Sequence, residues 1–264
     1  MQERRCQGIA RSVDERGIAR IVIDRPADHN TISAPASVAL ALAIDEVIDA
    51  APRVVLLTGT GAVFCAGGDI GEFQVHAGAL DGLVDRILSV LHPALARLAA
   101  LPVPVVTALN GSVAGAGVGL ALCGDFALAA ASMKLRTGYA AIGLSPDAGA
   151  SWFLARRVGA MRARQLFFTS ETIDAQRCLA EGIVDAVFAS DRLIPEAEAL
   201  CERLAGLSPG SLAAIKQLCD GASRPLEDHL ALEKSLLEER ARSGDAREGV
   251  AAFLTRRAPL FRGD

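Results

Sequence analysis

The sequence predicts an α/β fold, and two observations point to this class. Apolar runs of strand length alternate with stretches of helical periodicity in the first half of the chain, and helical patterns dominate after about Ala148. Alternating strands and helices are typical of layered proteins built from βα units. The chain has 264 residues, of which 51% are hydrophobic, so it can bury a substantial core. We therefore expect a globular α/β protein whose C-terminal third is mainly helical.

Local patterns predict the individual elements. Strands are expected where β-branched and leucine runs end in glycine or polar residues, at 18–24, 54–58, 103–109 and 125–130. Helices are expected around 37–50 and 83–101. After Ala148 strand signals fade, and helical patterns cover 151–157, 160–168, 174–181, 195–206, 211–219 and 225–243. We divide the chain into an α/β core over residues 1–200 and a helical region over 201–264 that covers the core or a neighbouring subunit.

Composition and charge argue against several classes of partner and indicate the cellular compartment. The net charge of −4 gives no basic footprint for nucleic acid or for an anionic membrane. Six cysteines are scattered without C-x-x-C spacing, as in proteins of a reducing compartment, and the histidines show no metal-ligand spacing. No apolar run approaches the roughly 18 residues of a membrane span, and the N-terminus lacks an apolar targeting segment. We expect a cytoplasmic protein with no nucleic acid, membrane or metal partner.

The glycine-rich stretch from Asn110 to Leu120 is the most informative motif. It reads N-G-S-V-A-G-A-G-V-G-L and follows the apolar run 104–109. Small residues at a strand-to-helix junction expose backbone amides that have no partner within the helix, at the positive end of its dipole. The pattern therefore predicts a cradle for a polarised oxygen, with close helix–sheet packing as the alternative.

A second glycine-rich strand end supports a shared ligand site. The apolar run from Val54 ends in Thr-Gly-Thr-Gly, and the chain resumes at Phe64 with the sequence F-C-A-G-G-D. Together the two stretches resemble the enoyl-CoA hydratase/isomerase (crotonase) superfamily, whose members carry F-x-A-G-x-D and, further on, N-G-x-x-x-G-x-G. The resemblance spans nearly the whole chain, from the segment at Ile21 to the segment that ends at Phe261.

The resemblance implies a fold, an assembly and a substrate class. The fold would be a crotonase-like spiral of ββα units followed by a helical region, assembled as a homotrimer or a dimer of trimers. The substrate would be an acyl-CoA thioester, so no cofactor is expected, because CoA is part of the substrate. Contacts to the substrate are implied at Arg25 and Ala27, at Ala66, Gly67, Asp69 and Ile70, at Ala114, Gly115 and Gly117, and at Tyr139; the arginines at 256 and 257 are further candidates for the CoA phosphates.

The catalytic residues are also implied residue by residue. The aligned backbone amides of Gly68 and Ala116 would hold the thioester oxygen, and one such donor is typically worth about 3 kcal/mol to the developing enolate. Hydratases of the family use two glutamates, but the matching positions here are Gly119 and Tyr139. Asp147 lies where isomerase-type relatives, notably 1,2-epoxyphenylacetyl-CoA isomerase, carry one catalytic aspartate. We therefore expect an isomerase that shifts a C=C bond, or isomerises a ring epoxide, by proton transfer through Asp147.

Several alternatives stay open at this stage. Asp147 follows a proline and precedes a helical run, so its side chain could cap that helix. Asp69 is expected to cap the helix that follows it, and Tyr139 could line the pocket, donate a hydrogen bond or only pack. His92 falls at a histidine of 4-chlorobenzoyl-CoA dehalogenases, which offers a covalent reading, although a structural role is the simpler one. A hydratase with an unlocated carboxylate, and a non-catalytic acyl-CoA or RNA binder, are the remaining readings.

Overall fold

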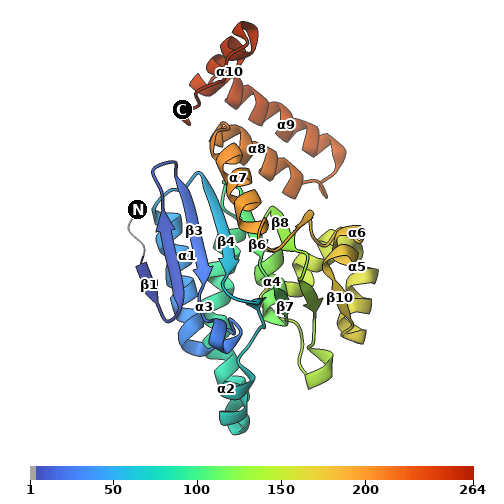
Figure 1. The fold of residues 1–264 in the computed structure, drawn as a ribbon. Coiled ribbons are helices and arrows are strands. Elements are labelled where there is room, and N and C mark those ends of the chain that lie inside the picture. Colours follow the sequence, from blue (N-terminus) through green and yellow to red (C-terminus); the bar gives the residue numbers. More distant parts are fainter. Residues whose placement is uncertain (1–3) are drawn as a thin grey trace.

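Two β-sheets and the helices packed on them form the core of the computed structural model, which describes residues 4–264 (Figure 1). Residues 1–3, at the start of the N-terminus that we expected to lack a targeting segment, lie outside this range. The larger sheet has the strand order β1-β2-β3-β4-β6-β8-β11, and the smaller one β10-β9-β7-β5. The strands of the larger sheet are Arg4–Cys6, Ile9–Val13, Ile18–Ile23, Val54–Gly59, Val105–Leu109, Phe126–Ala130 and Ala186–Phe188; those of the smaller sheet, in sheet order, are Thr172–Asp174, Lys134–Arg136, Ser112–Ala114 and Val63–Cys65.

The larger sheet is covered on both faces, which explains why the sequence of strand β4 is apolar throughout. Val55 and Leu57 face a core cluster that includes α1 (Ala34–Asp49) and α3 (Leu80–Ala99). Val54 and Leu56 face the opposite cluster, which includes α7 (Leu193–Ala205). Strands β3, β4, β6, β8 and β11 pair in parallel, and parallel strands buried on both faces have nearly continuous apolar sequences. The predicted α/β class is therefore confirmed.

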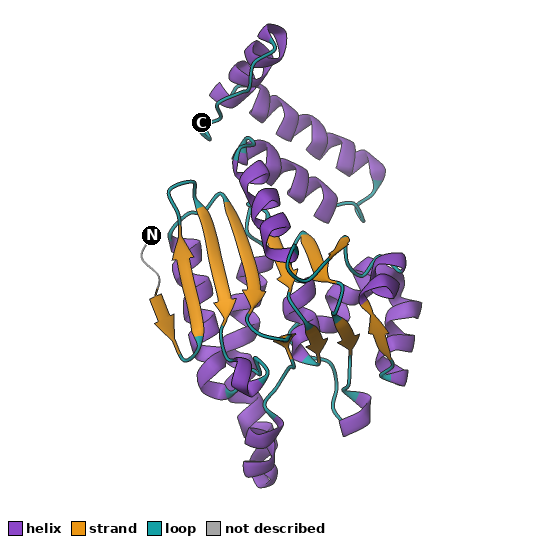
Figure 2. Ribbon diagram, viewed as in Figure 1, coloured by secondary structure: helices purple, strands orange, loops and turns teal. Residues whose placement is uncertain are grey.

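The smaller sheet lies below the larger one in Figure 2 and brings the two glycine-rich stretches together. Strand β5 leads to α2 (Ile70–Val75), and β7 leads to α4 (Ala116–Leu122). Because β5 and β7 pair in parallel, their carboxyl ends lie side by side. Helix α4 is entirely buried, and its glycines allow other backbone segments to approach it closely.

The C-terminal half matches most of the predicted helices but contains elements that were not predicted, as does the chain before Ala148, where β1, β2, β5, β7 and β9 lie outside the predicted strands. Helix α5 (Ala150–Thr169) has a non-helical residue at Gly159, in agreement with the two predicted helices. Helices α6 (Ala175–Ala180), α8 (Pro209–Asp220) and α9 (Leu226–Ala241) also match predicted segments, whereas α10 (Gly244–Thr255) was not expected. The expectation that strands fade after Ala148 is wrong for β10 and β11, because three-residue strands leave almost no periodic signal.

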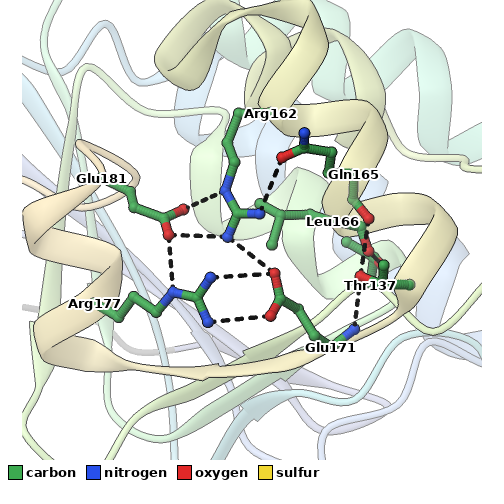
Figure 3. A network of polar contacts seen from close by, with 8 residues as sticks. Thr137, Arg162, Gln165, Leu166, Glu171, Arg177 and Glu181 are labelled. Atoms are coloured by element: carbon green, nitrogen blue, oxygen red, sulfur yellow. Dashed lines mark hydrogen bonds and ion pairs between the residues drawn. The ribbon is translucent and has the colours of Figure 1, made fainter.

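A four-residue ionic network holds α5 and α6 together (Figure 3). Arg162 pairs with Glu171 at 2.9 Å and with Glu181 at 2.8 Å. Arg177 pairs with the same two carboxylates at 3.0 and 2.8 Å. Beside this network, the Thr137 hydroxyl donates to the carbonyl of Leu166 on α5, so α5 also fixes the segment that follows β9.

The helices α8, α9 and α10 extend beyond the sheets, while α7 lies against the larger sheet (Figure 1). Helices α8 and α9 contain no fully buried residue. Ion pairs connect this region to the core, including Lys216 with Asp125 at 2.9 Å and Arg156 with Asp220 at 3.3 Å. Among the described helices, none combines the length and the apolar character needed to cross a lipid bilayer.

Candidate active site

A cavity of about 400 Å³ lies where three segments meet: the start of α2, the start of α4 and the loop before α5. Both cradle positions, Gly68 and Ala116, line it, and so does Asp147. The same three residues also line a small adjoining cavity of about 20 Å³. The other lining residues of the larger cavity are Ala66, Ile70, Phe73, Val84, Leu88, His92, Ala114, Gly115, Arg136, Thr137, Gly138, Tyr139, Ala141, Ile142, Leu144, Ser145 and Pro146.

At the predicted cradle, two backbone segments approach each other closely. A Cβ atom on Gly67 would lie 2.9 Å from the carbonyl oxygen of Ala114 and 3.1 Å from the nitrogen of Ala116, so residue 67 has no room for a side chain. Gly67 has φ +90° and Gly115 has φ +52°, both in the region that favours glycine. Ala116 is the first residue of α4, and the first amides of a helix lack an acceptor within that helix. The site therefore brings the backbone nitrogen at the start of α4 close to Gly67.

Asp147 is held by Tyr139. The Tyr139 hydroxyl donates to Oδ1 of Asp147 at 2.6 Å, which is the short distance typical of a hydrogen bond to an ionised carboxylate. Burial raises the pKa of the Asp147 carboxyl, and the hydrogen bond from Tyr139 partly opposes this effect. Burial and the neighbouring carboxylate raise the pKa of the Tyr139 hydroxyl, so the phenol keeps its proton as a donor.

The side chain of Asp147 does not cap helix α5. The residue at the cap position is Gly149, with φ +73°, and glycine has no side chain that could cap the helix. Asp147 contributes its backbone carbonyl, which accepts from the nitrogen of Ala150 at 2.8 Å. The helix-cap alternative is therefore wrong for the carboxylate, which is directed to Tyr139 instead. Asp69, in contrast, does cap a helix: its side chain accepts from the nitrogen of Glu72 at 3.1 Å at the start of α2, as expected.

The structure has no room for a side chain at Gly119, one of the two positions expected to match the glutamates of hydratases. A Cβ atom there would lie 1.9 Å from the carbonyl oxygen of Ala148, far inside contact distance. The backbone that carries Asp147 therefore occupies the space beside α4 that a side chain at residue 119 would need. At the second hydratase position, Tyr139 is only 6% exposed and its ring lies 6.0 Å from that of Phe167.

The predicted substrate contacts are divided between the cavity and its surroundings. Ala66, Ile70, Ala114, Gly115 and Tyr139 line the cavity. Gly67 and Asp69 belong to its backbone frame, as described above, and Gly117 packs against strand β5, since its Cβ would lie 2.3 Å from the carbonyl oxygen of Cys65. Their roles toward a substrate stay predictions.

Of the predicted CoA contacts, Arg25, Ala27 and the two C-terminal arginines lie outside the cavity lining, whereas Ala66 and Ile70 belong to it. Arg25 pairs with Asp28 at 2.8 Å, and the exposed Ala27 lies in the short helix between them. This segment adjoins the cradle, because the nitrogen of Ala66 donates to the carbonyl of His29 at 3.2 Å. Arg256 and Arg257 are exposed at the end of α10, and Arg257 pairs with Glu248 at 2.6 Å.

Sequence reasoning missed part of the lining. Val84 and Leu88 come from α3 and Phe73 from α2, so two helices that carry no catalytic motif form one wall. The apolar spacing of α3 was the available signal, but it could not tell a cavity wall from core packing. Arg136 adds a cation to the lining, and its Nε donates to the carbonyl of Ser170 at 3.1 Å.

Comparisons with known proteins agree with this geometry. The family model described as enoyl-CoA hydratase/isomerase matches residues 14–264. The chain is 36% identical over 252 residues to the 1,2-epoxyphenylacetyl-CoA isomerase of Escherichia coli (strain K12), covering 94% of this chain and 96% of that protein. It is 33% identical over 253 residues to the trans-2-decenoyl-[acyl-carrier-protein] isomerase of Streptococcus mutans, covering 94% and 96%.

A solved structure shows the same fold. The crystal structure of an enoyl-CoA hydratase from Polaromonas sp. JS666 superimposes with a TM-score of 0.89 at 32% identity, covering 96% of this chain and 99% of that chain. This similarity confirms the crotonase-like fold expected from the motifs. Relatives named as isomerases and as hydratases are both present. The chain belongs to the enoyl-CoA hydratase/isomerase (crotonase) superfamily.

Proposed function

We propose that this protein is an acyl-CoA isomerase that shifts a C=C bond by proton transfer through a thioester enolate. One observation supports this choice above the others. Among the described residues that line the cavity, Asp147 is the one carboxylate, and it shares that cavity with Gly68 and Ala116. A double-bond shift needs one group that takes and returns one proton, whereas hydration of an enoyl thioester also needs help to activate water.

In the proposed reaction the substrate is a 3-enoyl-CoA thioester. The Asp147 carboxylate removes a proton from C2, and the electron pair of that C–H bond moves toward the thioester carbonyl. The resulting dienolate places negative charge on the oxygen, which accepts hydrogen bonds from the amides of Gly68 and Ala116. Asp147, now a carboxylic acid, returns the proton to C4, and the product is the 2-enoyl-CoA ester. Ring epoxides are the second substrate class to test, because the Escherichia coli relative is named for one.

The raised pKa of Asp147 suits this role. A general base works best when its pKa lies nearer the working pH than that of an ordinary aspartate, because it then combines ionisation with basicity. Burial raises the pKa of the carboxyl. The hydrogen bond from Tyr139 limits this rise and also fixes the orientation of the carboxylate. Tyr139 is thus proposed as a positioning residue for the base as well as a wall of the acyl pocket.

The test is incubation with a panel of 3-enoyl-, 2-enoyl- and ring-epoxide CoA esters in deuterated water, with products and label position determined by mass spectrometry. We expect migration of the double bond, loss of this activity in Asp147→Asn, and unchanged acyl-CoA binding by that variant. Unchanged turnover in Asp147→Asn would remove Asp147 from its role. Water addition to crotonyl-CoA would instead identify a hydratase, and halide release from a halobenzoyl-CoA ester would favour the dehalogenase reading.

We also propose that the helical C-terminal region contacts a second copy of the chain, in a homotrimer or a dimer of trimers. Large apolar side chains are exposed along α9 and α10, namely Leu226, Leu230, Leu237, Val250, Phe253 and Leu254. Exposed apolar side chains grouped on one region favour an interface. Light scattering coupled to size-exclusion chromatography tests this proposal, and a monomer at micromolar concentration contradicts it.

A further inference from the structure

His92 contacts the loop that carries the proposed base, and the mechanism above does not use it. The residue lies on α3, between Leu91 and Leu95, which are buried at 1% and 3% exposure and anchor the helix to the core. Its ring lines the candidate active-site cavity and also a second cavity of about 620 Å³. The backbone nitrogen of Ala148 donates to Nε2 of His92 at 3.1 Å. Because Nε2 accepts a hydrogen bond, the ring carries its hydrogen on Nδ1.

The backbone of Ala148, the residue that donates this hydrogen bond, is strained. Ala148 has φ +48°, a conformation that costs a residue with a Cβ atom free energy relative to glycine, and it is followed by Gly149 at φ +73°. Ala148 is 1% exposed, so its amide cannot turn to water for a partner. A strained residue in a loop persists where surrounding contacts fix it.

Two contacts fix the backbone of Ala148, one at its N–H and one at its carbonyl oxygen. Its N–H is held by His92, and its carbonyl oxygen packs against Gly119, where a Cβ atom would approach to 1.9 Å. The peptide that ends at the Ala148 nitrogen begins at the carbonyl carbon of Asp147. The direction of the Asp147 side chain therefore depends on the peptide that His92 holds, and Tyr139 holds the carboxylate at its other end.

We propose that His92 is a positioning residue that fixes the Asp147 carboxylate in the cavity by accepting the hydrogen bond of the Ala148 amide. This inference rests on the proposed function, because it assumes that Asp147 transfers the proton. In this role the imidazole acts on the reaction through the loop. It adds a constraint from His92, which lies 56 residues before Ala148 in the sequence, to a loop whose own backbone conformation is unfavourable.

A matched pair of variants separates this role from simple packing. In His92→Gln the side-chain amide reaches about as far as Nε2, so its oxygen can accept from Ala148; in His92→Asn the amide is one methylene shorter and cannot. We expect kcat of His92→Asn to fall about 10- to 100-fold with little change in KM, since a small misplacement of a catalytic group has effects of this size. His92→Gln should recover most of the loss, and His92→Leu, a second variant without an acceptor, should behave like His92→Asn. Ser89→Ala, one turn earlier on an exposed position of α3, is the control and should match the wild type.

Double variants complete the test. If His92 acts through Asp147, then adding His92→Asn to Asp147→Asn should lower the residual turnover little further, because the two losses share one cause. Equal kcat in His92→Asn and His92→Gln, whether high or low, overturns the inference while the proposed function stands, provided that Asp147→Asn is inactive. Wild-type turnover in Asp147→Asn overturns both. Thermal unfolding of each variant confirms that the comparison is made on folded protein.

Discussion

Replacement of Tyr139 by phenylalanine tests whether the hydroxyl tunes the proposed base. The variant deletes the 2.6 Å hydrogen bond to Asp147 and keeps the ring in place against Phe167. That bond favours the ionised carboxylate, and the pKa of Asp147 is raised despite it, by burial. Removing the donor therefore raises the pKa of Asp147 further. Since the ionised form is the base, kcat/KM must then begin to fall at a higher pH as the solution is acidified.

The size of the effect follows from the charged hydrogen bond. Such bonds contribute about 1.5–3 kcal/mol, and about 1.4 kcal/mol corresponds to a tenfold change in the ratio of ionised to protonated carboxyl. On the acidic side of the profile, kcat/KM relative to its own plateau should thus fall about 10- to 150-fold more in Tyr139→Phe than in the wild type. The assay is the pH dependence of kcat/KM for double-bond migration, measured with the 3-enoyl-CoA ester that the panel identifies as best.

Phe167→Leu is the matched control for this experiment. It removes the ring that lies 6.0 Å from Tyr139 but leaves the hydroxyl and its acceptor. We expect the acidic limb of this variant to coincide with that of the wild type. If the scaled profiles of Tyr139→Phe and wild type superimpose, the hydroxyl does not set the ionisation of the base, and the reasoning is refuted.

Two further predictions concern packing and pH-dependent stability. Gly119→Ala should destabilise the fold by about 1–3 kcal/mol and lower kcat, because overpacking against the carbonyl of Ala148 outweighs the usual helical gain from alanine. Chemical denaturation measures the change in the free energy of unfolding. Gly82→Ala on α3 is the control and should be neutral or stabilising, because a Cβ atom there would meet nothing closer than 3.9 Å. The pKa values of Glu171 and Glu181 are lowered by their arginine partners, so both carboxylates favour the folded state above pH 4.5 and this contribution is lost as the pH falls below it. A double variant Glu171→Gln, Glu181→Gln should therefore differ from wild type in unfolding midpoint at pH 7 and converge with it under acid conditions; a constant difference at all pH values would contradict this.

The sequence predicts those features of the fold and site that depend on local patterns. The two glycine-rich stretches line one cavity, as expected of a shared ligand site, although the short strands β5 and β7 that bring them together were not predicted. The missed strands β10 and β11 have three residues each, and their pairing partners lie at least 36 residues away, so pairing and not propensity makes them strands.

The finer geometry of the site depends on contacts between distant segments. Tyr139 could equally have packed or donated, and the choice is made by the loop that places Asp147 within reach. The contact between His92 and Ala148 joins residues 56 apart, and the contact between Gly119 and Ala148 joins α4 to the loop before α5. No periodicity records such contacts, because each depends on how α3, α4 and α5 are arranged around the cavity.

The proposed cradle at Gly68 and Ala116 would use main-chain groups, and this has an evolutionary consequence. Mutation exchanges side chains, and proline is the one replacement that takes away the N–H itself. The proposed proton carrier, in contrast, is a side chain on a separate loop and can be gained, lost or relocated by a single codon change. A lineage built on this frame can thus retain recognition of thioesters while its members diversify in the reactions that follow.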